Sequence, residues 1–293
     1  MKLWHILLLV CLRGILPLTA DQITLSGTDL FNDEVKAGIE QAGEPMGLKA
    51  SWGGSFQALQ DLKSGKVDMA ILTSPSPEEL PDVVGIRRLP LAYRLCRVVV
   101  AKDNPINAIT YQQLRSIYGS RTQQRLESWK EIAKPSDILP EEWTNRVIEP
   151  MLPIAYSSFS REIFSYSVLK NDRVHPSVKV YKNEKDLQTA FAGKVGAIAV
   201  IASLSAEQFS KALPVAKEGG ESFSATPENL YFGDYPLYMP FSLYFPEIRT
   251  KEFLPIVEAF YSETVSKTIF ESGLAPVPDA FRKAELNRLK QGF

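Results

Sequence analysis

The sequence predicts an α/β protein in which strands and helices alternate. Short apolar runs alternate with amphipathic stretches along most of the chain, turn residues separate them, and 45% of the residues are hydrophobic. Such alternation favours parallel sheet, because parallel neighbours need a crossover connection. With 293 residues, the chain is long enough for one large domain or two smaller ones.

The first twenty residues have the pattern of a secretion signal. Lys2 precedes an apolar run over residues 3–12, and Leu18-Thr19-Ala20 matches a small-residue cleavage pattern. An uncleaved anchor is the alternative, although a run this short with Arg13 beside it spans a bilayer poorly. We therefore expect residues 1–20 to be a cleaved signal peptide and the mature protein to be periplasmic or secreted.

Two strand–turn–helix segments open the mature chain. Residues 22–27 alternate like a strand and lead through a turn to a helix over 34–47. A strand, a glycine-serine turn and a helix follow over 49–64, and Gly65 ends that helix before a strand that begins at Val67. Both segments are typical of β-α-β units.

The next apolar strand lies within residues 90–105 and ends at turn residues. Thr110 and Gln113 then match a capping box, so a short helix is expected from there to Gly119. In the polar region that follows, Trp129 and Trp143 are expected to be core aromatics.

The second half repeats the alternation and ends in a helix. The closing helix is expected within residues 250–267, where apolar residues recur at helical spacing. Strands are expected over 151–157, 178–182, 195–202 and 235–245. One helix is expected to start within the serine-containing stretch 156–169, and another is expected over 183–193.

Charge and composition exclude several classes of function. The 33 basic and 34 acidic residues are well mixed, so the chain shows no electrostatic footprint for nucleic acid. We expect no catalysis, because His175 is the only histidine after the signal and no nucleophile elbow is present. No metal-ligand spacing or cofactor motif appears, and the single mature cysteine, Cys96, is expected to be a small buried apolar residue.

Three predicted strand-to-helix turns carry groups that can bind an oxyanion. They contain Thr28 beside Asp29, Gly53-Gly54-Ser55, and the four residues 157–160. Free amides at a helix start and neighbouring hydroxyls donate hydrogen bonds to anions, and such turns lie at the carboxyl ends of strands. The alternative for each turn is an ordinary helix cap.

These segments, in this order, resemble the phosphate-type periplasmic solute-binding proteins of ABC transporters. The matching stretches are LSGTDL (25–30), GGSFQALQDLKSGKVDMAILTS (53–74), PLAYRLCRVVVAKDNPINAITYQQLRSIYG (90–119), SSFSREIFSYSVL (157–169) and VGAIAVIA (195–202). The resemblance implies a two-lobed periplasmic-binding-protein-like fold with two crossing hinge strands. The ligand closes between the lobes, and the partners are the membrane subunits of an ABC transporter.

The resemblance also implies a division of the chain and an oligomeric state. The first lobe would comprise residues 21–102 and 235–293, and the second lobe residues 103–234. The protein would be a monomer that binds a small, phosphate-like oxyanion and no nucleic acid.

Carrying the family's contacts across gives matches and departures. Ser55, Ser158 and Ser160 fall at hydroxyl positions of the family. Asp29 stands in place of a threonine, Thr73 in place of the aspartate that reads phosphate, Ile154 in place of an arginine, and Phe159 in place of a glycine. The expected ligand-binding residues are Thr28, Asp29, Gly54, Ser55, Thr73, Ser157, Ser158, Ser160 and Arg94.

The departures leave alternatives open. Asp29 and Thr73 can have exchanged roles, and Arg94 or Arg97 can supply the missing cation, although solvent exposure at a strand edge is the other interpretation of both arginines. The pocket can instead bind an uncharged or cationic small molecule. A third alternative is a degenerate binding-protein fold used as a sensor or protein-interaction module.

Overall fold

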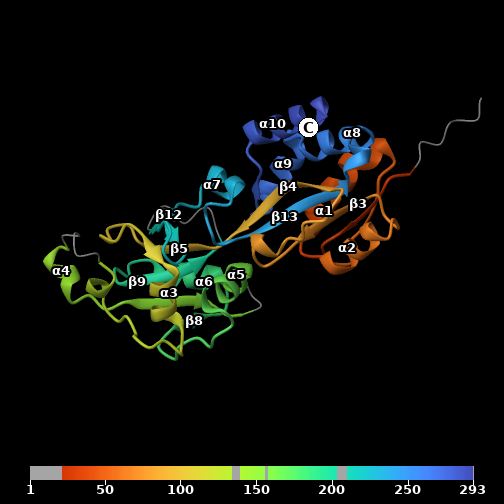
Figure 1. Ribbon diagram of the computed structural model, residues 1–293. Helices are drawn as coiled ribbons and strands as arrows, with labels where there is room; N and C mark the ends of the chain where they lie inside the picture. Colours follow the sequence, from red (N-terminus) through yellow and green to blue (C-terminus); the bar gives the residue numbers. More distant parts are fainter. Residues whose placement is uncertain (1–21, 134–138, 156–157, 203–209, 293) are drawn as a thin grey trace, which may run out of the picture.

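The computed structural model describes residues 22–133, 139–155, 158–202 and 210–292. Within these residues the chain forms two α/β lobes, which two neighbouring strands connect (Figure 1). The predicted signal peptide, residues 1–20, lies outside the described part. No helix of the described part has both the length and the apolar character needed to cross a membrane.

The first lobe is built on a six-stranded sheet in the order β14-β4-β13-β3-β1-β2. Its helices are α1 (Asp33–Gly43), α2 (Ser55–Lys63), α8 (Thr250–Phe260), α9 (Glu263–Glu271) and α10 (Asp279–Gln291). Its strands are β1 (Thr24–Gly27), β2 (Lys49–Ser51), β3 (Met69–Thr73), β4 (Ile86–Leu95), β13 (Tyr238–Pro246) and β14 (Ala275–Pro276). Helix α2 packs on β1 and β3, whereas α1 packs on α8 and α9.

The second lobe contains a five-stranded sheet, β10-β5-β9-β7-β8, and a small three-stranded sheet, β12-β11-β6. Its strands are β5 (Arg97–Ala101), β6 (Ile109–Thr110), β7 (Glu149–Pro153), β8 (Lys179–Tyr181), β9 (Ala197–Ile201), β10 (Ser210–Ala212), β11 (Val215–Ala216) and β12 (Ser222–Phe223). Its helices are α3 (Tyr111–Tyr118), α4 (Glu141–Thr144), α5 (Phe159–Phe164) and α6 (Glu184–Phe191), and α7 (Pro227–Phe232) precedes the returning strand β13.

The sheets are mixed rather than parallel, which corrects one expectation. Strand β1 is parallel to β2 and β3, and β7 is parallel to β8 and β9. The strands next to the connection are antiparallel, because β4 leaves the first lobe and β13 returns to it in the opposite direction. The β-α-β pattern therefore predicted only the part of each sheet that lies away from the connection.

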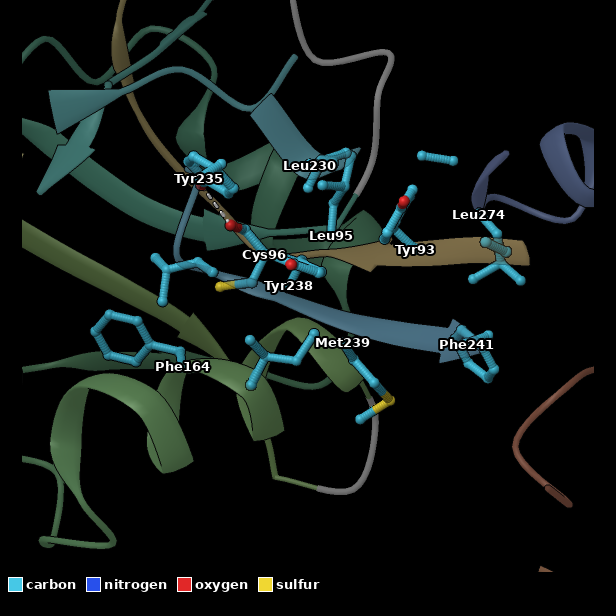
Figure 2. Close-up of a cluster of buried hydrophobic side chains, with 14 of the residues drawn as sticks. Tyr93, Leu95, Cys96, Phe164, Leu230, Tyr235, Tyr238, Met239, Phe241 and Leu274 are labelled. Atoms are coloured by element: carbon cyan, nitrogen blue, oxygen red, sulfur yellow. Dashed lines mark hydrogen bonds between the residues drawn. The ribbon is translucent and has the colours of Figure 1, made fainter. Parts of the chain in front are cut away.

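Strands β4 and β13 pair along their length and form the hinge. At the end of this pairing, the backbone N–H of Cys96 donates to the Leu237 carbonyl over 3.0 Å. The Tyr235 hydroxyl donates to the Cys96 carbonyl over 2.7 Å, as Figure 2 shows. Cys96 is fully buried, as expected for a small apolar residue, and burial raises the pKa of its thiol well above the usual value. The hinge is thus a packed, hydrogen-bonded crossing.

Two segments depart from the expected division into lobes. Residues 97–101 were expected in the first lobe, but as β5 they pair with β9 and β10 of the second sheet. Helix α7 falls in the range expected for the second lobe, yet the ring of Tyr231 stacks on Phe281 of α10 at 4.1 Å. The strand pairing thus places the passage between lobes at Cys96.

Most predicted elements are present, including the capping box at the start of α3. The Thr110 hydroxyl accepts from the Gln113 backbone N–H over 3.2 Å, and Gly119 caps the other end. Trp129 and Trp143 are buried and meet edge to face at 6.1 Å, which confirms them as core aromatics.

The expected single helix over 250–267 is instead two helices, α8 and α9. The Ser262 hydroxyl accepts from the Val265 backbone N–H over 3.3 Å and caps α9. The preceding residue, Tyr261, donates its hydroxyl proton to the Pro90 carbonyl over 2.8 Å. A local cap therefore breaks an apolar pattern that continues through both helices.

Candidate functional site

The two predicted turns of the first lobe meet at the end of β1. The Thr28 backbone N–H donates to the Ile71 carbonyl over 2.9 Å, and the Gly54 backbone N–H donates to the Gly27 carbonyl over 3.1 Å. A Cβ atom on Gly27 would lie 2.4 Å from the Trp52 ring, so a larger residue there would have to displace that ring. Parallel pairing of β1 with β3 therefore brings residues far apart in sequence to one edge.

Ser55 and Thr73 are linked through the backbone. The Ser55 hydroxyl accepts from the Thr73 N–H over 3.0 Å, which leaves the proton of that hydroxyl available for another acceptor. The Thr73 hydroxyl donates to the Pro240 carbonyl over 2.6 Å, in the hinge strand β13. Thr73 thus fastens β3 to the hinge.

The first turn combines a buried hydroxyl with an exposed acid. Thr28 is 1% exposed, and its hydroxyl accepts from the Leu30 backbone N–H over 3.3 Å. Asp29 is exposed and faces the second turn, since a Cβ atom on Gly54 would lie 3.6 Å from its Oδ1. Gly54 itself has φ of +102°, a conformation that favours glycine. Thr28, Asp29, Gly54, Ser55 and Thr73 are therefore neighbours.

The serine turn of the second lobe bonds to a carboxylate that the sequence analysis did not single out. Ser158 and Ser160 have their hydroxyl oxygens 2.7 Å apart, and both hydroxyls donate to Oε1 of Glu184, the Ser160 bond over 2.6 Å. The backbone N–H of Ala202 donates to both oxygens of the same carboxylate, over 3.1 and 3.0 Å. We call these two hydroxyls and this amide the anion seat.

Arg94 spans the two lobes. From β4 its Nη2 donates to the Leu30 carbonyl in the first lobe over 3.2 Å, and its guanidinium lies 4.1 Å from the centre of the Phe159 ring in the second. Burial lowers the pKa of Arg94 to about 10, and the negative charge of Glu184 opposes that shift. Within the described residues, its buried Nε has no hydrogen-bond partner.

Exposure at a strand edge, the other interpretation of Arg94, does not hold. Strand β4 lies inside the sheet, between β13 and the short β14, whose Ala275 and Pro276 pair with Tyr93 and Ala92. Among the remaining residues, Ile154 is 49% exposed, and Ser157 lies outside the described residues.

Comparison with known proteins assigns the chain to a family. A family model described as a PBP superfamily domain matches residues 17–268. The chain belongs to the PBP superfamily. Protein SphX of Synechococcus elongatus is 25% identical to it over 248 residues, which are 81% of this chain and 70% of that protein.

Solved PBP-like structures share the two-lobed fold. A possible phosphate binding protein from Planctomyces limnophilus has a TM-score of 0.62 at 15% identity, covering 94% of this chain and 99% of the other. PstS from Borrelia burgdorferi has a TM-score of 0.65 at 15% identity, covering 87% and 98%. An ABC-type phosphate transport receptor from Vibrio cholerae has a TM-score of 0.53 at 23% identity, covering 87% and 99%. At these identities the likeness concerns the fold.

A separate cavity of about 660 Å³ lies between the two lobes, and none of the expected ligand-binding residues lines it. Its wall includes Glu78 and Glu79 of the first lobe, which bond to Lys217 and to the Tyr166 hydroxyl of the second. These contacts join side chains of the two lobes across the cavity. Among the described residues, no group of three or more His, Cys, Asp or Glu side chains is arranged to hold a metal ion.

Proposed function

We propose that the protein is an extracytoplasmic solute-binding protein that captures phosphate or a related oxyanion between its lobes for an ABC transporter. Arg94 carries the proposal, because it is a half-buried cation that touches both lobes and keeps one buried N–H without a partner. A charged donor of this kind forms the strong hydrogen bonds that oxyanion binding needs. Family membership supports the mode of capture.

In the proposed site, each lobe contributes donors to the ligand. Ser55 supplies a hydroxyl proton from the first lobe, and Ser158 and Ser160 supply hydroxyls from the second. Arg94 supplies the positive charge in place of the arginine that Ile154 replaces. Asp29, at the rim of the first turn, accepts the proton of a protonated phosphate, whereas Thr73 serves the hinge.

The test is titration calorimetry of the full chain with phosphate, sulfate and molybdate at constant ionic strength. We expect phosphate to bind. The Arg94→Gln variant should have an affinity for phosphate about 10- to 100-fold lower, since a hydrogen bond to a charged group contributes about 1.5–3 kcal/mol. Arg94→Lys should lose less, because it keeps the charge, and the exposed Arg121→Gln is the control. Binding of none of the three anions would contradict the proposal.

Export is part of the same proposal. Residues 1–20 would direct secretion, and the mature chain would begin at Asp21 and remain monomeric. N-terminal sequencing of the protein from the extracytoplasmic fraction should read Asp21 first. An intact Met1 in that fraction would contradict signal cleavage.

A second candidate function is a sensor or protein-interaction module. The occupied anion seat favours it, because Glu184 already takes the second-lobe donors. The calorimetric test separates the two candidates, since an interaction module would leave the oxyanions unbound.

A further inference from the structure

The anion seat already holds an anion that belongs to the protein. Glu184 opens helix α6, and its carboxylate accepts the Ser158 and Ser160 hydroxyls and the Ala202 amide. These three elements are separate in sequence, because the serines follow β7 and Ala202 follows β9. Parallel pairing of β7 with β9 brings them together.

The donors of the seat are of the kind that bind an oxyanion of any origin. Ser160 is completely buried, so its hydroxyl needs a partner inside the protein. Hydrogen bonds to a carboxylate are stronger than bonds between neutral groups. A negative charge is therefore well held by these hydroxyls and this amide, whether it is Glu184 or a ligand.

We propose that the Glu184 carboxylate is a built-in occupant of the anion seat, which an incoming oxyanion has to displace. This inference rests on the proposed function for its ligand, but the occupied seat is a property of the free protein. Two anions cannot both be bound by the same three donors. Each donor has one proton to give, and two negative charges at short range repel each other. Glu184 thus competes with the ligand and sets its affinity.

The effect of removing the charge has a definite sign. Glu184→Gln keeps the size of the side chain but takes away the charge that repels an oxyanion. We expect phosphate to bind the variant at least about tenfold more tightly, since a change of about 1.4 kcal/mol corresponds to that factor. Glu184→Asp keeps the charge on a shorter side chain, so its affinity for phosphate should lie between those of Glu184→Gln and the natural protein.

Two measurements test this inference: hydrogen exchange of the protein without ligand, and titration calorimetry with phosphate. Exchange of the Ala202 amide reports whether the carboxylate is seated, and the phosphate dissociation constant reports the competition. Both are measured on the full chain and its Glu184→Gln and Glu184→Asp variants. Asp186→Asn is the matched control, because it removes one charge from the same helix at a side chain that bonds to Asn183 and not to the seat.

The expected result is a protected Ala202 amide in the natural protein and in the control, faster exchange in Glu184→Gln, and tighter phosphate binding by that variant alone. An unprotected amide in the natural protein overturns the inference even where phosphate binds. Weaker phosphate binding by Glu184→Gln also overturns it, because Glu184 would then be a ligand contact. A protected amide without phosphate binding in any variant supports the occupied seat and contradicts the proposed function.

Discussion

At the scale of single residues, the Ser55 hydroxyl has both a structural role and a proposed role in ligand binding. Its hydroxyl accepts the Thr73 amide over 3.0 Å, and its proton remains for a ligand at the start of α2. Loss of this hydroxyl should therefore show in two different measurements.

Ser55→Ala should lower both stability and affinity. The Thr73 amide would lose its acceptor, so we expect the free energy of unfolding to fall by about 1–2 kcal/mol, and phosphate affinity to fall about tenfold. Chemical denaturation and calorimetry measure the two effects. Ser64→Ala is the control, because that hydroxyl donates to the Asp61 carbonyl over 3.1 Å at the other end of α2. Equal phosphate affinity in both variants would remove Ser55 from the site.

Residue types predicted which turns carry donors, but not their partners. Ser158 and Ser160 were recognisable from sequence as an oxyanion-binding turn, whereas Glu184 was not, since it lies more than twenty residues away and opens an ordinary amphipathic helix. Exposure at a strand edge was the favoured interpretation of Arg94 from sequence, because the two-residue strand β14 that pairs with its neighbours has no distinctive pattern. Contacts between residues that only the pairing of distant strands brings together cannot be read from the sequence.

At the scale of elements, Asp68 joins the start of β1 to the segment before α8. Its carboxylate accepts the Thr24 N–H and hydroxyl, both over 2.8 Å, and pairs with Arg249. Burial alone would raise the pKa of Asp68, but the hydrogen bonds from Thr24 and the Arg249 guanidinium outweigh it and hold that pKa below its usual value.

Asp68→Asn should destabilise the first lobe in a pH-dependent way. Since the folded pKa of Asp68 is lowered, its contribution is complete above the unfolded value near 4 and is lost as the pH falls through the folded value. We expect a loss of about 1–3 kcal/mol at pH 7 that shrinks below about pH 4. Denaturant titrations across pH measure it, with Asp82→Asn, whose side chain is 96% exposed, as control. A difference independent of pH would be inconsistent with this role.

Helices and strands were predicted well where a single local sequence pattern specifies them. The capping box at Thr110 and the apolar run of β9 each specify a local structure that the fold keeps. The closing helix was predicted as one piece because Ser262 caps α9 without interrupting the apolar spacing. Strand direction near the hinge follows from the crossing of β4 and β13, a long-range property that local patterns do not contain.

At the scale of the whole molecule, polar contacts join the two lobes at the 660 Å³ cavity. Glu78 pairs with Lys217, with 56% and 51% of these side chains exposed, and Glu79 accepts the Tyr166 hydroxyl. Exposed ion pairs of this kind contribute about 0–1 kcal/mol. Their loss should therefore cost little stability.

The double variant Glu78→Gln, Glu79→Gln should alter the arrangement of the lobes more than their stability. We expect the unfolding free energy to change by less than about 1 kcal/mol, while small-angle scattering without ligand shows a larger radius of gyration. Glu141→Gln with Glu142→Gln, in α4, is the control with the same change of charge. An unchanged radius would show that these contacts do not hold the lobes.

A crystal structure of the protein grown with saturating phosphate tests the proposed site directly. We expect phosphate between the lobes, bonded to Ser55 and Arg94 on one side and to Ser158 and Ser160 on the other, with Glu184 turned out of the anion seat. Phosphate bound away from these residues, or Glu184 still bonded to both serines beside a bound phosphate, would contradict it.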